Sequence, residues 1–166
     1  MNKLLCTLLL GTLPALAFAT GNHAGGHAHD ANAMASMHQD EHASAAGKAG
    51  DLAKVNRIIG ISMDDTMRFT PSQISVKKGE TIRFSVKNAG KLSHEMVIDT
   101  MSELNEHAEM MRKMPGMKHA EPNTVSLAAG QRGDIVWQFD QTGMVDFACL
   151  VPGHMEAGMV GKVTVE

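Results

Sequence analysis

The chain has 166 residues, of which nine are histidine, fourteen are methionine and two are cysteine, and its formal net charge at pH 7 is −3. No basic stripe is present, which excludes nucleic acid as a partner, and no polybasic segment is available to attach the chain to a membrane surface.

The first nineteen residues predict a secretory signal. Lys3 precedes a short apolar run from Leu4 to Leu16, and small residues follow up to Ala19, which is the charged, apolar and cleavage-site order of such signals. The run is too short to span a bilayer, and no second run of spanning length follows it. We therefore expect a secreted, soluble protein from which Cys6 is removed together with residues 1–19.

Residues 20–51 predict a disordered tail. The segment is rich in Gly, Ala, Ser, Met and His and contains no Leu, Ile, Val or Phe, so it cannot bury a core. Its five histidines are His23, His27, His29, His38 and His42. A His-rich tract of this kind indicates weak capture of Cu(II), Ni(II) or Zn(II), the alternative being a solvated linker.

Residues 52–166 predict one domain whose apolar residues recur with a period of two. Ile82, Phe84 and Val86, for example, alternate with polar residues, which is typical of a strand with one buried face. Gly-containing turns separate such runs. The expected strands are 55–62, 73–77, 81–88, 94–98, 124–127, 133–139, 144–149 and 160–166. Short strands at this spacing predict an all-β, Greek-key β-sandwich.

One insertion, residues 101–122, breaks the alternation. It is expected to form either a short helix that begins at Ser102 and ends before Pro115, or a mobile flap.

The insertion is also rich in methionine. Met110, Met114 and Met117 would share one side of a helix, given their spacings of four and three. They form either a core face or, with His107 or His119, a weak additional Cu(I) site.

The stretch "CLVPGHMEAGM", residues 149–159, carries the strongest chemical signal. Cys149 is followed by His154 and Met159 at intervals of five residues. A lone cysteine in a secreted chain is an intermolecular disulfide partner, a reactive thiol, a metal ligand or an inert buried residue. Pro152 and two glycines shape a tight loop that can turn three side chains toward one point. Two histidines and one cysteine with a weak axial methionine form a blue-copper site, so the loop can supply three of four copper ligands.

The fourth ligand should be a second histidine. Seven other histidines lie in the tail or in or beside the Met-rich insertion, whereas His94 begins a strand pattern in "NAGKLSHEMVID". We therefore expect His94 to complete the set.

Two stretches of the chain resemble the cupredoxin family of small blue or green copper proteins. They are "VKKGETIRFSVKNAGKLSHEMVID" (76–99) and "GMVDFACLVPGHMEAGMVGKVTVE" (143–166). In the second stretch Cys, His and Met occur in that order and are followed by a Gly-x-Val motif. The resemblance implies one type 1 copper ion with His94, Cys149 and His154 as strong ligands and Met159 as the weak axial ligand. With its His-rich tail and Met-rich insertion, the chain is most similar to periplasmic cupredoxins associated with copper tolerance.

Two features of the sequence depart from the family pattern. Glu95 stands where plastocyanin-like sequences usually carry an asparagine that ties the two ligand loops together. Four residues separate Cys149 from His154, as in azurin-like and auracyanin-like sites, where plastocyanin has two.

These features predict a periplasmic copper-binding protein of copper tolerance and homeostasis that acts as a monomer. The alternative is a soluble periplasmic electron carrier that cycles Cu(II)/Cu(I) and docks with a redox or copper-trafficking protein. We prefer tolerance because a dedicated carrier has no evident need for a His-rich tail and a Met-rich insertion. An enzyme is disfavoured, because multicopper oxidases need a His-Cys-His segment and Cys149 is flanked by Ala148 and Leu150.

Overall fold

The computed structural model describes residues 44–114 and 121–166. The expected signal, most of the His-rich tail, Met117 and His119 lie outside the described residues. The described elements are, in chain order, β1 (Lys48–Ala49), the 3-10 helix η1 (Leu52–Lys54), β2 (Arg57–Asp64), β3 (Arg68–Thr70), β4 (Gln73–Val76), β5 (Thr81–Asn88), β6 (His94–Asp99), α1 (Met101–Lys113), β7 (Thr124–Leu127), β8 (Arg132–Gln138), β9 (Gly143–Ala148) and β10 (Val160–Val165).

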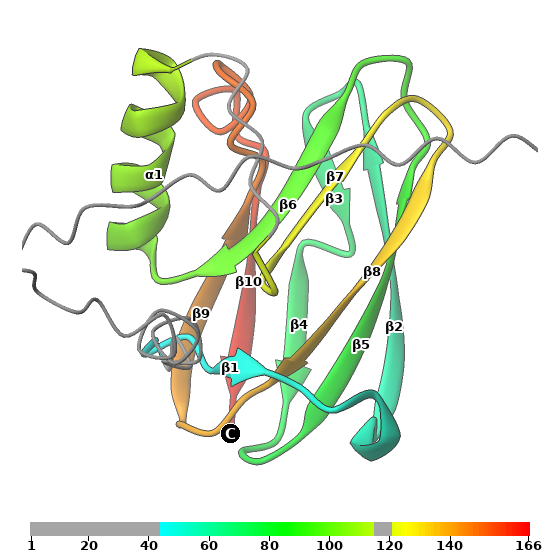
Figure 1. Ribbon diagram of the computed structural model, residues 1–166, viewed down its shortest axis with the longest axis vertical. Coiled ribbons are helices and arrows are strands. Elements are labelled where there is room, and N and C mark those ends of the chain that lie inside the picture. The colour runs from blue at the N-terminus through cyan, green and yellow to red at the C-terminus, as the bar shows by residue number, and fades with distance from the viewer. Residues whose placement is uncertain (1–43, 115–120) are drawn as a thin grey trace, which may run out of the picture. The chain divides into compact units, whose positions relative to one another are not determined.

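The strands form two five-stranded sheets (Figure 1). The strand order is β1-β8-β5-β2-β3 in the first sheet and β4-β10-β9-β6-β7 in the second. The pairs β2–β5 and β4–β10 are parallel, and the other strand pairs of the two sheets are antiparallel. The predicted all-β, Greek-key sandwich is confirmed, and the eight expected strands lie within two residues of their expected bounds.

The core lies between the two sheets, where the period-two pattern places the apolar side chains. Ile82, Phe84 and Val86 of β5 are fully buried, as the alternation predicts. Phe69 of the first sheet meets Phe147 of the second edge to face, with ring centroids 5.0 Å apart. This contact fixes the spacing of the sheets close to the end of β9, which immediately precedes Cys149.

The domain begins earlier than expected. The composition predicts a disordered tail up to residue 51, yet β1 pairs with β8 and Ala46 is buried. The indole Nε1 of Trp137 donates a hydrogen bond of 2.9 Å to the carbonyl of Ala46, 91 residues away in sequence. The boundary at Leu52 is therefore wrong, because a long-range contact orders a segment that has no strand pattern of its own.

The insertion forms a helix up to Lys113, and it begins at Met101 rather than Ser102. The hydroxyl oxygen of Thr100 caps it, accepting a hydrogen bond of 3.3 Å from the amide of Glu103. The Thr100 hydroxyl in turn donates to the Glu103 carboxylate over 3.2 Å, and the Thr100 amide donates to Asp99 Oδ1 over 2.8 Å.

One face of α1 is buried against the second sheet. Leu104, Ala108 and Met111 of this face join an apolar cluster with Val97, Ala148 and Leu150. The helix therefore packs against β6, β9 and the residue that follows Cys149, as expected of a folded insertion and not of a flap. No described helix is long and apolar enough to cross a membrane.

The methionines of α1 divide between two environments. Met111 is buried, whereas Met110 and Met114 are 44% and 43% exposed. The core face expected of Met110, Met114 and Met117 is therefore wrong for the first two, which face solvent, and the buried methionine of the helix is Met111.

Candidate metal centre

Three of the four predicted ligand residues meet at one end of the sandwich. Their ligand atoms, one each from His94, Cys149 and His154, all lie within 4.8 Å of one another. The Cys149 sulfur is 3.4 Å from His154 Nδ1, and the two imidazole rings have centroids 4.9 Å apart. We refer to these three residues as the ligand cluster.

The sheet brings the cluster together. β6 and β9 are antiparallel, with Val97 opposite Ala148, so the start of β6 and the residues after β9 lie at the same end of the sheet. His94 opens β6 and Cys149 follows β9 directly. The backbone amide of Glu95 donates a hydrogen bond of 3.3 Å to the Cys149 sulfur. The two halves of the cluster, 55 positions apart in the chain, are thus joined by a hydrogen bond from a backbone amide to the cysteine sulfur.

Residues 149–159, the ligand loop, are held closed by backbone hydrogen bonds. The Cys149 amide donates to the Met159 carbonyl over 3.1 Å, and the Met159 amide donates to the His154 carbonyl over 3.0 Å. Gly153 and Gly158 have φ of +88° and +94°, a region that glycine enters without a side-chain clash. The guanidinium of Arg68 donates to the Ala157 carbonyl over 2.9 Å, which attaches the loop to β3.

Met159, the fourth predicted ligand, is fully buried. Its backbone is bonded to both Cys149 and His154, so the residue lies next to the cluster at the start of β10. Its role as an axial ligand stays a prediction.

The hydrogen bonding of His94 tests whether the cluster fits a metal ion. The His94 side chain is fully buried, and Nδ1 has no hydrogen-bond partner among the described residues, whereas Nε2 lies 3.2 Å from an oxygen of Asp65. A buried polar atom without a partner costs about 1–3 kcal/mol. A metal ion bound to Nδ1 would remove that cost, and a thiolate and two imidazoles are donors suited to a soft or borderline ion. The residues present therefore fit a metal ion.

Burial also sets the protonation of the cluster. It raises the pKa of the Cys149 thiol to about 11, against the opposing effect of the amide hydrogen bonds from Glu95 and Val151. Burial lowers the pKa of His154, and the neighbouring His94 lowers it further. The thiol is therefore protonated at neutral pH when no metal is bound, and a metal ion must displace that proton.

Glu95 departs from the family pattern without loss of the link between the ligand segments. Its carboxylate accepts a hydrogen bond of 2.6 Å from the Ser126 hydroxyl, and so turns toward β7. The tie to Cys149 is made by the Glu95 backbone amide, which any residue other than proline would supply.

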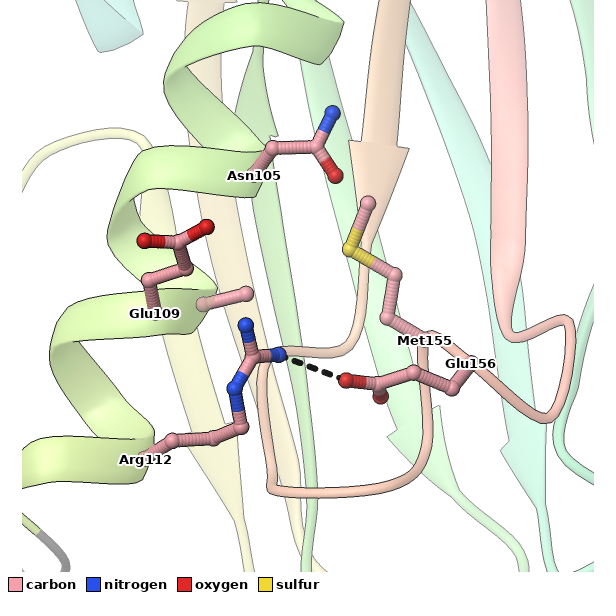
Figure 2. Close-up of a pocket in the computed structure, with 6 residues that line it drawn as sticks. Asn105, Glu109, Arg112, Met155 and Glu156 are labelled. Carbon is pink, nitrogen blue, oxygen red and sulfur yellow. Dashed lines mark hydrogen bonds and ion pairs between the residues drawn. The ribbon is translucent and has the colours of Figure 1, made fainter.

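Helix α1 lies beside the ligand loop (Figure 2). Arg112 of the helix and Glu156 of the loop form an ion pair of 2.7 Å, and Met155 points into the space between the two segments. The cavity there has a volume of about 410 Å³ and is lined by Asn105, Ala108, Glu109, Arg112, Met155 and Glu156. The cluster itself lies apart from this cavity, since no ligand residue lines it.

Asp65 is the site residue that the sequence did not predict. It lies in the turn between β2 and β3, 29 residues before His94, and its contact with His94 Nε2 exists only in the folded chain. No motif or periodicity marks this position. The predicted metal-binding histidines of the tail and His119 lie outside the described residues, so the structure adds nothing about them.

The sequence and the fold both have known counterparts. The profile of the copper binding proteins of the plastocyanin/azurin family matches residues 55–166. The copper-resistant cuproprotein CopI of Rubrivivax gelatinosus is 50% identical over 143 residues, covering 86% of this chain and 80% of that protein. CopI of Pseudomonas aeruginosa PAO1 is 34% identical over 154 residues, covering 75% and 84%.

Solved structures of auracyanins share the fold. Dithionite-reduced auracyanin of Roseiflexus castenholzii has a TM-score of 0.57 at 21% identity, covering 66% of this chain and 96% of that one. Auracyanin B has a TM-score of 0.59 at 19% identity, covering 72% and 96%. At these identities the likeness concerns the fold alone.

Proposed function

The chain belongs to the plastocyanin/azurin family of copper-binding proteins, and from that premise we propose that it is a periplasmic cupredoxin that holds one type 1 copper ion and serves in copper tolerance. The relatives that carry the name copper-resistant cuproprotein support the tolerance role. Their description as cuproproteins also supports a function that is not enzymatic. The predicted signal in residues 1–19 supports export to the periplasm.

The proposed ligands are His94 Nδ1, Cys149 Sγ, His154 Nδ1 and, as the weak axial ligand, Met159. The proposal depends most on His94, which belongs to the cluster with the thiol and the second imidazole and whose buried Nδ1 has no hydrogen-bond partner among the described residues. A copper ion bound there would supply one-electron exchange. The protein contributes a fixed and dry set of donors, because Cys149, His94 and Met159 are all buried.

His154 is the ligand closest to solvent. It is half-buried, whereas the other three proposed ligands are fully buried. Its ring is therefore the route by which an electron or a copper ion would reach the site from outside. This arrangement serves both copper tolerance and electron transfer, so the two functions must be separated in the cell.

Deletion of the gene in a copper-challenged host distinguishes a role in copper tolerance from a role in electron transfer. We expect growth to fail at copper concentrations that the parent strain survives, with respiration unchanged at low copper. Complementation with the intact gene should restore growth, and complementation with a Cys149→Ser gene should not, because that variant lacks the thiolate. Normal growth of the deletion strain at high copper together with a respiratory defect would favour the electron carrier instead.

Copper affinity is expected to rise with pH. Each binding event releases the Cys149 proton at any pH below about 11, so the apparent affinity should increase about tenfold per pH unit around neutrality. The lowered pKa of His154 keeps its imidazole neutral over this range and adds no second proton. Competition with a Cu(I) chelator of known proton affinity at pH 7, 8 and 9 measures the slope. An affinity that stays constant across these pH values would show that the thiol is not a ligand.

A further inference from the structure

The carboxylate of Asp65 is in direct contact with the ligand cluster. Its Oδ1 lies 3.2 Å from His94 Nε2, the ring atom remote from the unpartnered Nδ1. The His94 side chain is fully buried, and that of Asp65 is 37% exposed. The carboxylate thus reaches from the surface turn between β2 and β3 to the back of a buried ring.

The position of this carboxylate is fixed by the turn that precedes His94. Lys91 and Leu92 donate their backbone amides to it over distances of 2.8 to 3.1 Å. A side chain at Gly90 would place a Cβ 2.1 Å from Asp65 Oδ1, so the carboxylate occupies space that only glycine leaves open.

The same turn is anchored from the other side by Asn88. This fully buried residue donates its amide Nδ2 to the Leu92 carbonyl over 2.7 Å and accepts a hydrogen bond from the Gly90 amide over 2.9 Å. The turn is therefore held at both ends, and Asp65 is fixed by contacts that do not involve a metal ion. Such fixed support is what orients a ligand before the metal arrives.

A carboxylate at Nε2 determines which nitrogen of His94 is available. The neutral ring carries one proton, and the carboxylate can only accept, so the proton lies on Nε2 and the lone pair on Nδ1. Nδ1 is the buried atom without a partner among the described residues. A histidine that binds a metal through one nitrogen and donates the other N–H to a carboxylate is also a stronger donor to the metal.

We propose that Asp65 is a positioning residue of the metal centre, which presents His94 Nδ1 unprotonated to the metal and, through its negative charge, favours Cu(II) over Cu(I). This inference rests on the proposed copper site. Asp65 does not touch the metal in this account and acts through the imidazole of His94. Its effect should therefore appear in affinity and potential, while the thiolate–copper bond remains.

Asp65→Asn tests the proposal, with Asp64→Asn as the matched control. Asp64 is the neighbouring residue, the last of β2, and its carboxylate accepts hydrogen bonds from the amide and hydroxyl of Thr66. Both variants remove one negative charge, but only Asp65 contacts His94. We expect Asp65→Asn to lower Cu(II) affinity by about 10- to 100-fold, the usual cost of losing such a partner. The charge-transfer band of the Cys149–copper bond should persist.

The reduction potential gives the sharper readout. The expected loss of affinity concerns Cu(II) and not Cu(I). The midpoint potential of Asp65→Asn should therefore rise by about 59 mV for each tenfold loss of Cu(II) affinity relative to Cu(I) affinity. The potential of Asp64→Asn should stay near that of the wild type. An unchanged potential in Asp65→Asn, or an equal rise in both variants, would overturn the proposal. If wild-type protein with copper lacks the thiolate band, the proposed copper site fails instead, and the two failures are thereby distinguished.

A measurement on the wild-type chain covers the case in which Asp65→Asn does not fold. Nitrogen-15 NMR of the metal-free protein at pH 8 reports which ring nitrogen of His94 is protonated. We expect the proton on Nε2, and a proton on Nδ1 would overturn the proposal without any variant.

Discussion

Replacing Cys149 with serine should abolish the intense thiolate-to-copper absorption and weaken copper binding by more than the roughly 10- to 100-fold typical of losing an outer partner. Cys149 is fully buried and supplies the only described cysteine sulfur. A serine hydroxyl of nearly the same size fits the space but offers a hard, protonated oxygen in place of a soft thiolate. Absorption spectroscopy and chelator competition measure the two effects.

The fold of the Cys149→Ser variant must be shown to survive. The hydrogen bond from the Glu95 amide to the residue at position 149 can be accepted by a serine oxygen, so far-ultraviolet circular dichroism and the thermal midpoint of the metal-free variant should stay close to the wild type. A variant that keeps the absorption band would show that the thiolate–copper bond has been assigned wrongly.

Gly161→Ala should destabilise the domain by about 1–3 kcal/mol, the usual cost of overpacking a core. A Cβ at Gly161 of β10 would lie 2.1 Å from the ring of Phe147, its paired residue on β9. That ring cannot withdraw freely, because it is fully buried and packs edge to face on Phe69. Urea unfolding of the metal-free protein measures the loss.

Gly60→Ala is the matched control for this substitution. Gly60 also lies within a strand, β2, but a Cβ there would meet nothing within 4 Å. We expect its unfolding free energy to stay at or slightly above the wild-type value, since alanine has less chain entropy to lose on folding. Equal destabilisation by both substitutions would indicate a general cost of replacing strand glycines, and would contradict the tight β9–β10 contact beneath the ligand loop.

Much of the sandwich could be predicted because the alternation of apolar and polar residues is a local feature of the sequence. The alternation of Ile82, Phe84 and Val86 depends only on which side of a strand faces the core, and these residues are buried as expected. The helix cap also has a local signature, because Thr100 is followed three residues later by Glu103, and the structure places the cap at Thr100 and not at Ser102.

Two features that the sequence did not predict, β1 and the contact of Asp65 with His94, depend on residues distant in sequence. β1 is two residues long and is ordered by pairing with β8 and by the hydrogen bond from Trp137 to Ala46. The local sequence around β1 does not indicate either contact. The ligand cluster could be anticipated because Cys149 and His154 lie in one loop with a recognisable order, and because His94 is the other histidine at which the sequence shows the start of a strand pattern. Asp65 could not, since only the folded turn between β2 and β3 brings it to His94.

Anomalous X-ray diffraction at the copper edge, from crystals of the protein loaded with one equivalent of copper, tests the central claim most directly. We expect one strong peak bonded to His94 Nδ1, Cys149 Sγ and His154 Nδ1, with Met159 as the more distant sulfur ligand and His94 Nε2 still facing Asp65. A principal peak at the exposed methionines of α1, or one bonded to His94 through Nε2, would contradict the account.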